Sequence, residues 1–195
     1  MNLPNLLSLL RIILTPLFII LLFSESSSNK FFALVVFVVA AITDAYDGHL
    51  ARKYNLITPE GKFLDPLADK ILVLSAFFSF AFIGIIDFWM VGIITFRDLF
   101  ITGLRLVISS KGFEFVTSNL SKYKTAFQLT IIILTLIFLT IEGFKIDQLI
   151  PTLDLIKDYK IIYILTMFTA IFTAYTGIIY LYTNRIVIKD FINNS

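Results

Sequence analysis

The sequence contains no cysteine, one histidine and one tryptophan among its 195 residues. The absence of cysteine excludes a disulfide framework, a cysteine-ligated zinc site and a cysteine nucleophile. Charged residues are also scarce, at 15% of the chain, and the formal net charge is only +2. An average soluble domain is about 25% charged, and a net charge this small gives no indication of a nucleic-acid partner.

Hydrophobic residues take the place of the missing charges, at 58% of the chain with a mean hydropathy of +0.90. This composition argues against a disordered chain and against a water-soluble globule, which is about 45–50% apolar. A helix needs about 20 apolar residues to cross a bilayer. Six segments approach that length: Leu6–Phe23, Phe31–Ala45, Ile71–Ile86, Phe88–Ser109, Thr125–Ile141 and Ile161–Tyr182. We therefore predict an all-α, polytopic membrane protein with six transmembrane helices in a single domain, residues 1–195, with polar connectors such as Glu142–Lys160.

The N-terminal residues do not resemble a cleavable signal peptide, because the apolar run is too long, contains Arg11 and is followed by no A-x-A-like site. We expect Met1–Arg11 to form a short amphipathic segment that lies on the membrane surface and leads into the first span.

The lysines and arginines between the spans predict the orientation in the membrane. If all six segments cross, both termini share one side with nine basic residues: Arg52, Lys53, Lys62, Lys70, Lys111, Lys122, Lys124, Arg185 and Lys189. The other side has four: Lys30, Lys145, Lys157 and Lys160. Because basic residues concentrate in cytoplasmic loops, we expect an integral protein of the cytoplasmic membrane with both termini in the cytoplasm.

Four aspartates stand at two boundaries of the apolar segments. On helices, Asp44 and Asp47 are i,i+3 neighbours and Asp65 and Asp69 are i,i+4 neighbours, so each pair projects from one face. Like charges at these spacings repel, and an aspartate at mid-membrane costs up to about 2.5–3.5 kcal/mol. Carboxylates that need a cation suit Mg²⁺ together with phosphate oxygens. The spacing therefore predicts a two-metal centre for phosphoryl chemistry, with solvated helix ends as the structural alternative.

The complete string is Asp44-x2-Asp47-Gly48-x2-Ala51-Arg52-x8-Gly61-x3-Asp65-x3-Asp69. It resembles, without departure, the signature of the CDP-alcohol phosphatidyltransferase family. The resemblance implies that an alcohol attacks the lipid-bearing phosphorus of CDP-diacylglycerol and that CMP leaves. It implies two Mg²⁺ or Mn²⁺ ions on Asp44, Asp47, Asp65 and Asp69, with Asp69 also the catalytic general base. It further implies a homodimer, an active site on the cytoplasmic side, and binding of the CDP-lipid by Asn5, Gly48, Ala51, Arg52 and Gly61.

Other strings indicate the acceptor. The opening Asn2–Arg11, Arg97-Asp98 with Gly103-Leu104-Arg105, and Ser121–Gln128 resemble phosphatidylglycerophosphate synthases, which use glycerol 3-phosphate. A phosphorylated acceptor needs fixed cations, and cations inside an apolar segment are expensive unless they are paired. The resemblance therefore assigns the acceptor phosphate to Arg97, Arg105, Lys122 and Lys124.

Several alternatives remain open at this stage. Asp98 and Ser121 also occur in cardiolipin synthases of the family, whose acceptor is phosphatidylglycerol. A second interpretation of Arg97 is that it forms a structural salt bridge with Asp98 or Asp87. A second interpretation of Lys122 is that it is only one of the positive charges on the cytoplasmic side. A membrane protein that binds or transports cations would use acids too, but it would place them near the bilayer midplane in broken or repeated helices.

Overall fold

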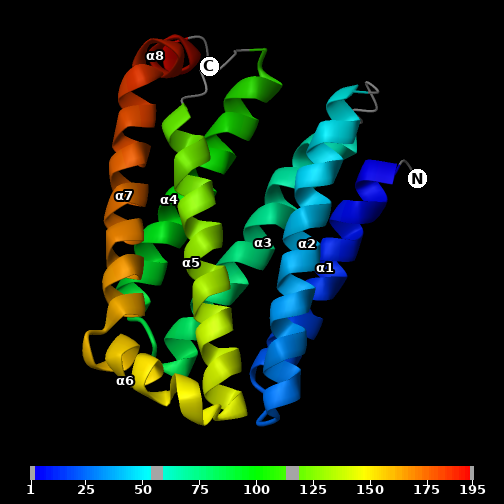
Figure 1. The fold of residues 1–195 in the computed structure, drawn as a ribbon. Coiled ribbons are helices and arrows are strands. Elements are labelled where there is room, and N and C mark those ends of the chain that lie inside the picture. Colours follow the sequence, from blue (N-terminus) through cyan, green and yellow to red (C-terminus); the bar gives the residue numbers. More distant parts are fainter. Residues whose placement is uncertain (1–2, 54–58, 113–118, 194–195) are drawn as a thin grey trace.

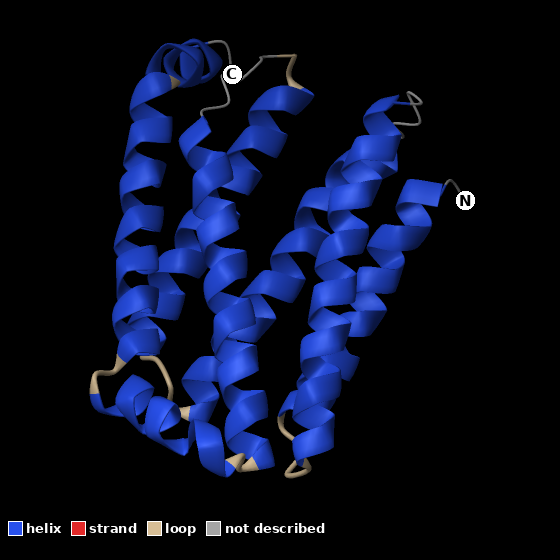
Figure 2. Ribbon diagram, in the orientation of Figure 1, coloured by secondary structure: helices blue, strands red, loops and turns tan. Residues whose placement is uncertain are grey.

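Helices account for nearly all of the described chain (Figures 1 and 2). The computed structural model describes residues 3–53, 59–112 and 119–193, and within them it contains helices and short turns but no strand. The long helices are α1 (Leu3–Leu22), α2 (Ser27–Lys53), α3 (Pro59–Ile83), α4 (Phe88–Ser110), α5 (Asn119–Phe144) and α7 (Ile161–Thr183). The shorter elements are the 3-10 turn η1 (Asp147–Leu149), α6 (Ile150–Asp158) and α8 (Arg185–Asn193). The prediction of an all-α fold is confirmed.

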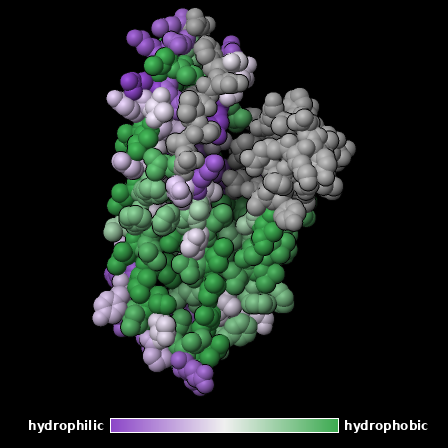
Figure 3. Space-filling model, turned by 45° about the horizontal axis from the view of Figure 1, so that its top comes forward, coloured by the Kyte–Doolittle hydropathy of each residue, from purple (hydrophilic) through white to green (hydrophobic). Residues whose placement is uncertain are grey.

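Each predicted apolar segment coincides with one long helix, but the membrane character of these helices differs. Among the described residues, two helices are long and apolar enough to cross a bilayer, Leu120–Phe144 and Ile161–Thr183. Helices α1, α2 and α3 have shorter apolar parts, Leu9–Leu22, Ser27–Thr43 and Lys70–Ile83. Figure 3 shows apolar side chains across the middle of one face and polar side chains gathered toward its ends. Six spans stay a prediction, whereas two helices meet the criterion directly.

The first helix contains most of the expected surface segment. Helix α1 runs without a break from Leu3 to Leu22, so Leu3–Arg11 is not set apart from the part that follows. The side chain of Arg11 is buried, at 2% exposure. Leu9 and Leu10 beside it are exposed, and the side chains of the preceding residues lie outside the described ones. A location of this segment on the membrane surface therefore stays a prediction.

The polar connector Glu142–Lys160 contains a helix that its composition does not predict. Helix α6 has nine residues, and it packs against α5 and α7 with Leu153 buried. A helix this short obtains its stability from packing rather than from intrinsic propensity, which is why the sequence alone does not reveal it.

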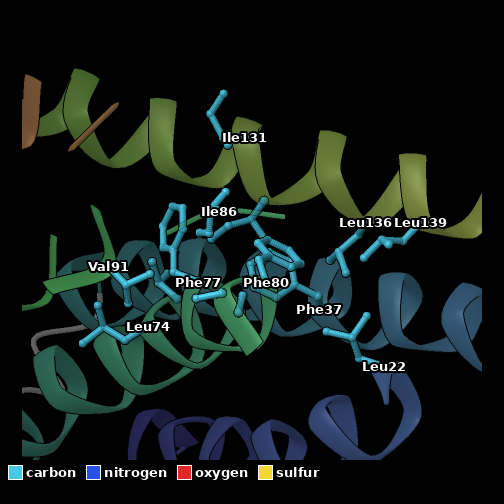
Figure 4. Packing of buried hydrophobic residues seen from close by; sticks show 14 of the residues in the cluster. Leu22, Phe37, Leu74, Phe77, Phe80, Ile86, Val91, Ile131, Leu136 and Leu139 are labelled. Atoms are coloured by element: carbon cyan, nitrogen blue, oxygen red, sulfur yellow. The ribbon is translucent and has the colours of Figure 1, made fainter. Parts of the chain in front are cut away.

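One hydrophobic core joins the helices. Phe37 of α2, Phe77 of α3 and Leu136 of α5 are buried and converge in the cluster drawn in Figure 4. Phe18 of α1 joins the same cluster, with its ring 5.6 Å from that of Phe37. Helix α4 packs against α3 and α7, and α5 packs against α2 and α7. The core therefore fixes the relative positions of α3, α4, α5 and α7, which carry the site described below.

Helix α7 presents a stripe of small residues to its neighbours. The buried side of the helix includes Thr166, Thr169, Thr173, Thr176 and Gly177. Small residues at helix contacts let two backbones approach closely. The approach is tightest at Gly177, where an added Cβ would lie 2.9 Å from Cγ of Arg97 on α4.

The topology gathers several helix ends at one end of the bundle. Figure 1 shows the C-terminal end of α2, the start of α3, the end of α4, the start of α5 and helix α8 all at this end, together with both termini. The turn from α1 to α2 and helix α6 lie at the opposite end. The predicted metal-binding positions of α2 and α3 are therefore at the same end as the basic residues near the junction of α4 and α5.

Candidate active site

Helices α2 and α3 carry the acidic motif. Asp44 and Asp47 belong to the C-terminal part of α2, and Asp65 and Asp69 belong to the N-terminal half of α3, so the backbone has the helical spacing that the sequence predicts. The side chains of these acids lie outside the described residues, as do those of the predicted CDP-lipid residues Asn5, Gly48, Ala51, Arg52 and Gly61. Across the described part of the chain, no other group of three or more histidines or acids is arranged to hold a metal ion.

A basic pocket of about 230 Å³ lies between α3, α4 and α5. Four cationic side chains line it: Lys70, Arg97, Arg105 and Lys124. The remaining lining residues are Ile101, Thr102, Leu106, Ser121 and Thr125. Lys70 directly follows Asp69 in α3, so the basic pocket is adjacent along the helix to the last acid of the motif. The structure thus brings together three of the four residues predicted for the acceptor phosphate.

Lys122, the fourth predicted residue, does not line the basic pocket and is exposed. The physical reason is helical geometry, because residues two positions apart project from different faces. Lys124 enters the pocket wall from α5, and Lys122 therefore points away from it. The interpretation of Lys122 as a phosphate ligand is not favoured by this arrangement.

A buried carboxylate holds two of the cations. The side chain of Asp98 has 0% exposure, and Lys124 Nζ donates to both of its oxygens over 2.7 and 2.8 Å. Arg97 Nη1 donates to Oδ1 over 3.0 Å, and Gln128 Nε2 donates to Oδ2 over 3.2 Å. The bridge between Arg97 and Asp98 that the sequence left open is therefore present, and Arg97 lines the pocket at the same time.

Helix α7 fixes the two arginines from the other side. Arg97 Nη2 donates to the hydroxyl of Thr176 over 3.2 Å, and Arg105 Nε donates to the hydroxyl of Tyr180 over 3.3 Å. The Arg105 guanidinium also lies 5.5 Å from the centroid of the Tyr180 ring, within cation–π range. Arg97 Nε is buried and has no acceptor among the described residues. Both arginines are therefore oriented, and Arg97 keeps one further donor on each of Nη1 and Nη2.

The arrangement is suited to an anion. Among the described residues, Arg97, Arg105 and Lys124 together with Asp98 give the basic pocket and its wall a formal charge of +2, and Lys70, which has a further interaction of its own, also lines the pocket. Buried like charges are costly unless a counter-charge is present. Arginine presents a planar fork of donors that matches phosphate, and lysine contributes a point charge. A phosphate group therefore satisfies both the charge and the donors of the pocket.

Asp87, the other acid weighed as a partner for Arg97, is occupied elsewhere. Its Oδ2 accepts hydrogen bonds from the Tyr163 hydroxyl over 2.7 Å and from Trp89 Nε1 over 3.2 Å. Asp87 lies just before α4 begins, ten positions before Arg97, which corresponds to roughly 15 Å along a helix at 1.5 Å per residue. It therefore takes no part in the basic pocket.

The sequence matches a known protein family over most of its length. The sequence model described as CDP-alcohol phosphatidyltransferase matches residues 1–175. The chain belongs to this family. The matched region contains the whole acidic motif and the four cations of the basic pocket, whereas Thr176 and Tyr180, which orient the arginines, lie just beyond it.

Curated family members are similar over most of the chain. Several of them are named CDP-diacylglycerol–glycerol-3-phosphate 3-phosphatidyltransferase, including the following three. The one from Bacillus subtilis (strain 168) is 40% identical over 136 residues, which is 64% of this chain and 70% of the relative. The one from Rickettsia typhi is 35% identical over 167 residues, covering 82% of this chain and 94% of the relative. The one from Wigglesworthia glossinidia brevipalpis is 33% identical over 180 residues, covering 83% of this chain and 94% of the relative.

Sequence reasoning missed part of the site. The sequence identifies Asp98 only as a partner for Arg97 and as a residue shared with cardiolipin synthases, and it assigns no individual role in the site to Lys70, Gln128, Thr176 or Tyr180. The sequence does contain a signal for Asp98 and Lys70. Asp98 is a charge inside an apolar segment beside Arg97, and Lys70 is a charge beside Asp69, the last motif acid; a charge in either place needs a partner. No signal exists for Thr176 or Tyr180, because their role depends on how α7 packs against α4.

Proposed function

We propose that this protein transfers the phosphatidyl group of CDP-diacylglycerol to glycerol 3-phosphate and releases phosphatidylglycerophosphate and CMP. The names of its relatives state this reaction for them. The observation that carries the proposal is the basic pocket, in which Lys70, Arg97, Arg105 and Lys124 converge beside the helix that contains Asp69. An acceptor that already bears a phosphate is the substrate that such a pocket selects.

The four motif acids are the proposed metal ligands. The donor set fits a hard divalent cation, since Asp44, Asp47, Asp65 and Asp69 offer only carboxylate oxygens. We assign to them two ions of Mg²⁺ or Mn²⁺, which when bound neutralise the diphosphate and stabilise charge on the leaving CMP. Gly48, Ala51, Arg52 and Gly61, with Asn5 of α1, are assigned to the CDP-lipid.

Asp69 and the basic pocket act on the acceptor. With the acceptor phosphate held by the pocket cations, its free hydroxyl is directed toward the neighbouring part of α3, where Asp69 takes up the proton as general base. The hydroxyl oxygen forms a bond to the lipid-bearing phosphorus, the phosphoanhydride bond breaks, and CMP carries away the bonding pair. Fixing the phosphate converts the attack into an effectively unimolecular step.

The same proposal includes the setting of the reaction. Residues 1–195 form one membrane domain in which α1, α2, α3, α4, α5 and α7 cross the cytoplasmic membrane. Both termini and the active site face the cytoplasm, and two copies associate as a homodimer. The two helices that meet the membrane-span criterion and the apolar middle of the face drawn in Figure 3 support the location in a membrane.

The pocket also bears on the alternative functions. A volume of about 230 Å³ suits a small phosphorylated alcohol, which favours glycerol 3-phosphate over the phosphatidylglycerol of a cardiolipin synthase. The one acid buried within α4, Asp98, is already paired with two cations, which disfavours a cation carrier.

The decisive experiment supplies purified protein with radiolabelled CDP-diacylglycerol and either glycerol 3-phosphate or phosphatidylglycerol. Formation of phosphatidylglycerophosphate and CMP from glycerol 3-phosphate alone is the expected result. Cardiolipin formed from phosphatidylglycerol, with no product from glycerol 3-phosphate, would transfer the protein to the other branch of the family. No turnover with either acceptor, together with metal-dependent ion uptake into vesicles, would support the carrier.

A further inference from the structure

Asp98 is an acid in the wall of a pocket that is suited to an anion. By Coulomb's law alone, a carboxylate at this place weakens the attraction of the pocket for phosphate. Its burial also carries a desolvation cost. Such a residue needs a role that outweighs both effects, and the metal motif on α2 and α3 does not include it.

The hydrogen bonds of Asp98 exclude an active chemical role. Oδ1 accepts from Lys124 and Arg97, and Oδ2 accepts from Lys124 and Gln128. A carboxylate offers about four acceptor sites, so these four bonds saturate it. Asp98 therefore has no free site with which to accept a substrate proton or to ligate a metal.

The bonds leave donors on the cations for another ligand. Lys124 has three N–H donors, of which two are directed to Asp98. Arg97 has five donors; one Nη1 donor goes to Asp98 and one Nη2 donor goes to Thr176, so each of these nitrogens keeps a second donor, whereas Nε is buried on the side of Gly177. Both side chains are thus fixed at one end while donors stay available at the pocket that they line.

We propose that Asp98 is a positioning residue that holds Lys124 and Arg97 in the arrangement that receives the acceptor's phosphate. This inference rests on the proposed function, since it takes the anion in the basic pocket to be glycerol 3-phosphate. Long cationic side chains lose rotamer freedom when they bind a ligand, and holding them in place beforehand removes that cost from binding. Helix α5 contributes to the same arrangement, because Lys124 and Gln128 are i,i+4 neighbours that both reach Asp98.

The test is the substitution Asp98→Asn, for which two explanations predict opposite signs. If Asp98 only dilutes the positive charge of the pocket, its neutralisation lowers the KM for glycerol 3-phosphate. If Asp98 positions the two cations, the KM for glycerol 3-phosphate rises by about tenfold or more, since charge-assisted bonds are lost, while the KM for CDP-diacylglycerol stays within about twofold. A lower or unchanged KM for glycerol 3-phosphate, or an equal rise for both substrates, overturns the proposal.

A matched control is available at the other end of the bundle. Glu142 forms an ion pair with Lys157 over 2.6 Å, and neither residue lines the basic pocket. Glu142→Gln therefore makes the same chemical change in another ion-paired acid, and both KM values should stay at the wild-type level. A rise in the KM for glycerol 3-phosphate in this control would show that loss of an ion pair anywhere in the bundle is sufficient, which contradicts a specific role for Asp98.

Two further variants keep the test informative if Asp98→Asn fails to fold. Gln128→Met removes one of the four bonds to Asp98 and preserves an unbranched side chain, so a smaller rise in the KM for glycerol 3-phosphate is expected. In a Lys124→Gln background, Gln128→Met should have little further effect on that KM, because the residues act through one network. Fully additive effects on KM in the folded double variant contradict the proposal.

Direct binding separates this inference from the proposed function. Isothermal titration of glycerol 3-phosphate into the detergent-solubilised protein measures affinity without CDP-diacylglycerol. A wild-type protein that binds glycerol 3-phosphate but does not convert it contradicts the proposed function alone. A folded Asp98→Asn or Gln128→Met variant that binds it as tightly as the wild type contradicts the positioning role alone. A wild-type protein that does not bind it contradicts both.

Discussion

Gly177 provides a way to displace Arg97 without changing any charged residue. Its hydrogen faces α4, and a Cβ built at this position would meet Arg97 Cγ at 2.9 Å, Nε at 3.5 Å and Cδ at 3.7 Å. The closest of these atoms belongs to the inner part of the arginine side chain, which cannot swing away as a free end would. We therefore predict that Gly177→Ala moves Arg97 relative to the basic pocket.

The size of the effect follows from the distances. Ordinary contact with a Cβ begins at 3.4 Å, so Arg97 Cγ must retreat by about 0.5 Å, the difference between 3.4 and 2.9 Å. Misplacing a positioning group by about 1 Å costs on the order of 10²-fold in rate, so half that shift predicts a fall of about tenfold in kcat/KM for glycerol 3-phosphate. Because Arg97 is proposed to bind the acceptor's phosphate, we expect this loss as a rise in KM. Tenfold corresponds to about 1.4 kcal/mol, slightly less than the roughly 1.5–3 kcal/mol of a charge-assisted hydrogen bond. The bonds from Arg97 to Asp98 and Thr176 are thus expected to weaken rather than to break.

Gly92 of α4 is the matched control, because a Cβ there meets nothing within 4 Å. Both substitutions replace glycine by alanine within a helix, a change that favours the helix by about 0.8–1.0 kcal/mol in water. Initial rates are measured over a range of glycerol 3-phosphate concentrations at saturating CDP-diacylglycerol, and then with the substrates exchanged. Gly177→Ala should raise only the KM for glycerol 3-phosphate, and Gly92→Ala should change neither value. An unchanged KM in Gly177→Ala, or equal effects of the two substitutions, would refute this account of Arg97.

Further predictions concern the metal centre, the base, the pocket and the far end of the bundle. Excess EDTA should abolish turnover and added Mg²⁺ or Mn²⁺ should restore it, so full activity in EDTA would exclude the metal centre. Asp69→Asn should lower kcat by about 10²–10⁴-fold, as loss of a general base does, while binding of CDP-diacylglycerol persists in a filter assay; near-normal turnover removes Asp69 from this role. Arg105→Ala should raise the KM for glycerol 3-phosphate by about one to two decades, whereas Lys122→Ala should not change it, and a reversed order would contradict the pocket. The hydrogen bond to Glu142 raises the pKa of Lys157 above the ordinary lysine value of 10.5. The ion pair is therefore intact below pH 10.5 and is lost as the pH rises through the raised pKa, so it should contribute no pH dependence to turnover near neutral pH; a pH–activity profile whose shape near neutral pH changes in Glu142→Gln would contradict this.

The sequence predicts the helices better than it predicts the pocket. Six apolar segments coincide with six long helices because a continuous apolar run depends only on local composition. Helix α6 escapes prediction since it is short and depends on contacts with α5 and α7. The acidic motif is recognisable because its acids lie within single helices at fixed spacing.

The pocket, in contrast, is assembled from residues far apart in the chain. Asp98 and Lys124 are 26 positions apart, and Arg97 and Thr176 are 79 apart. No local pattern encodes such pairs. Lys122 and Lys124 show the same limit at short range, since their spacing alone says that they face different sides but not which side faces the pocket.

The threonine stripe of α7 has a consequence for which substitutions the chain tolerates. Thr166 and Thr169 donate to the backbone carbonyls of Ile162 and Leu165, four residues earlier, over 2.8 and 2.9 Å. Their hydroxyls are therefore satisfied within their own helix, and neighbouring helices meet only their size and shape. Thr176 differs, because its hydroxyl also accepts a hydrogen bond from Arg97. Thr166 and Thr169 should therefore tolerate substitution by residues of similar volume, such as valine. Thr176 should tolerate only residues that keep a hydrogen-bond acceptor for Arg97.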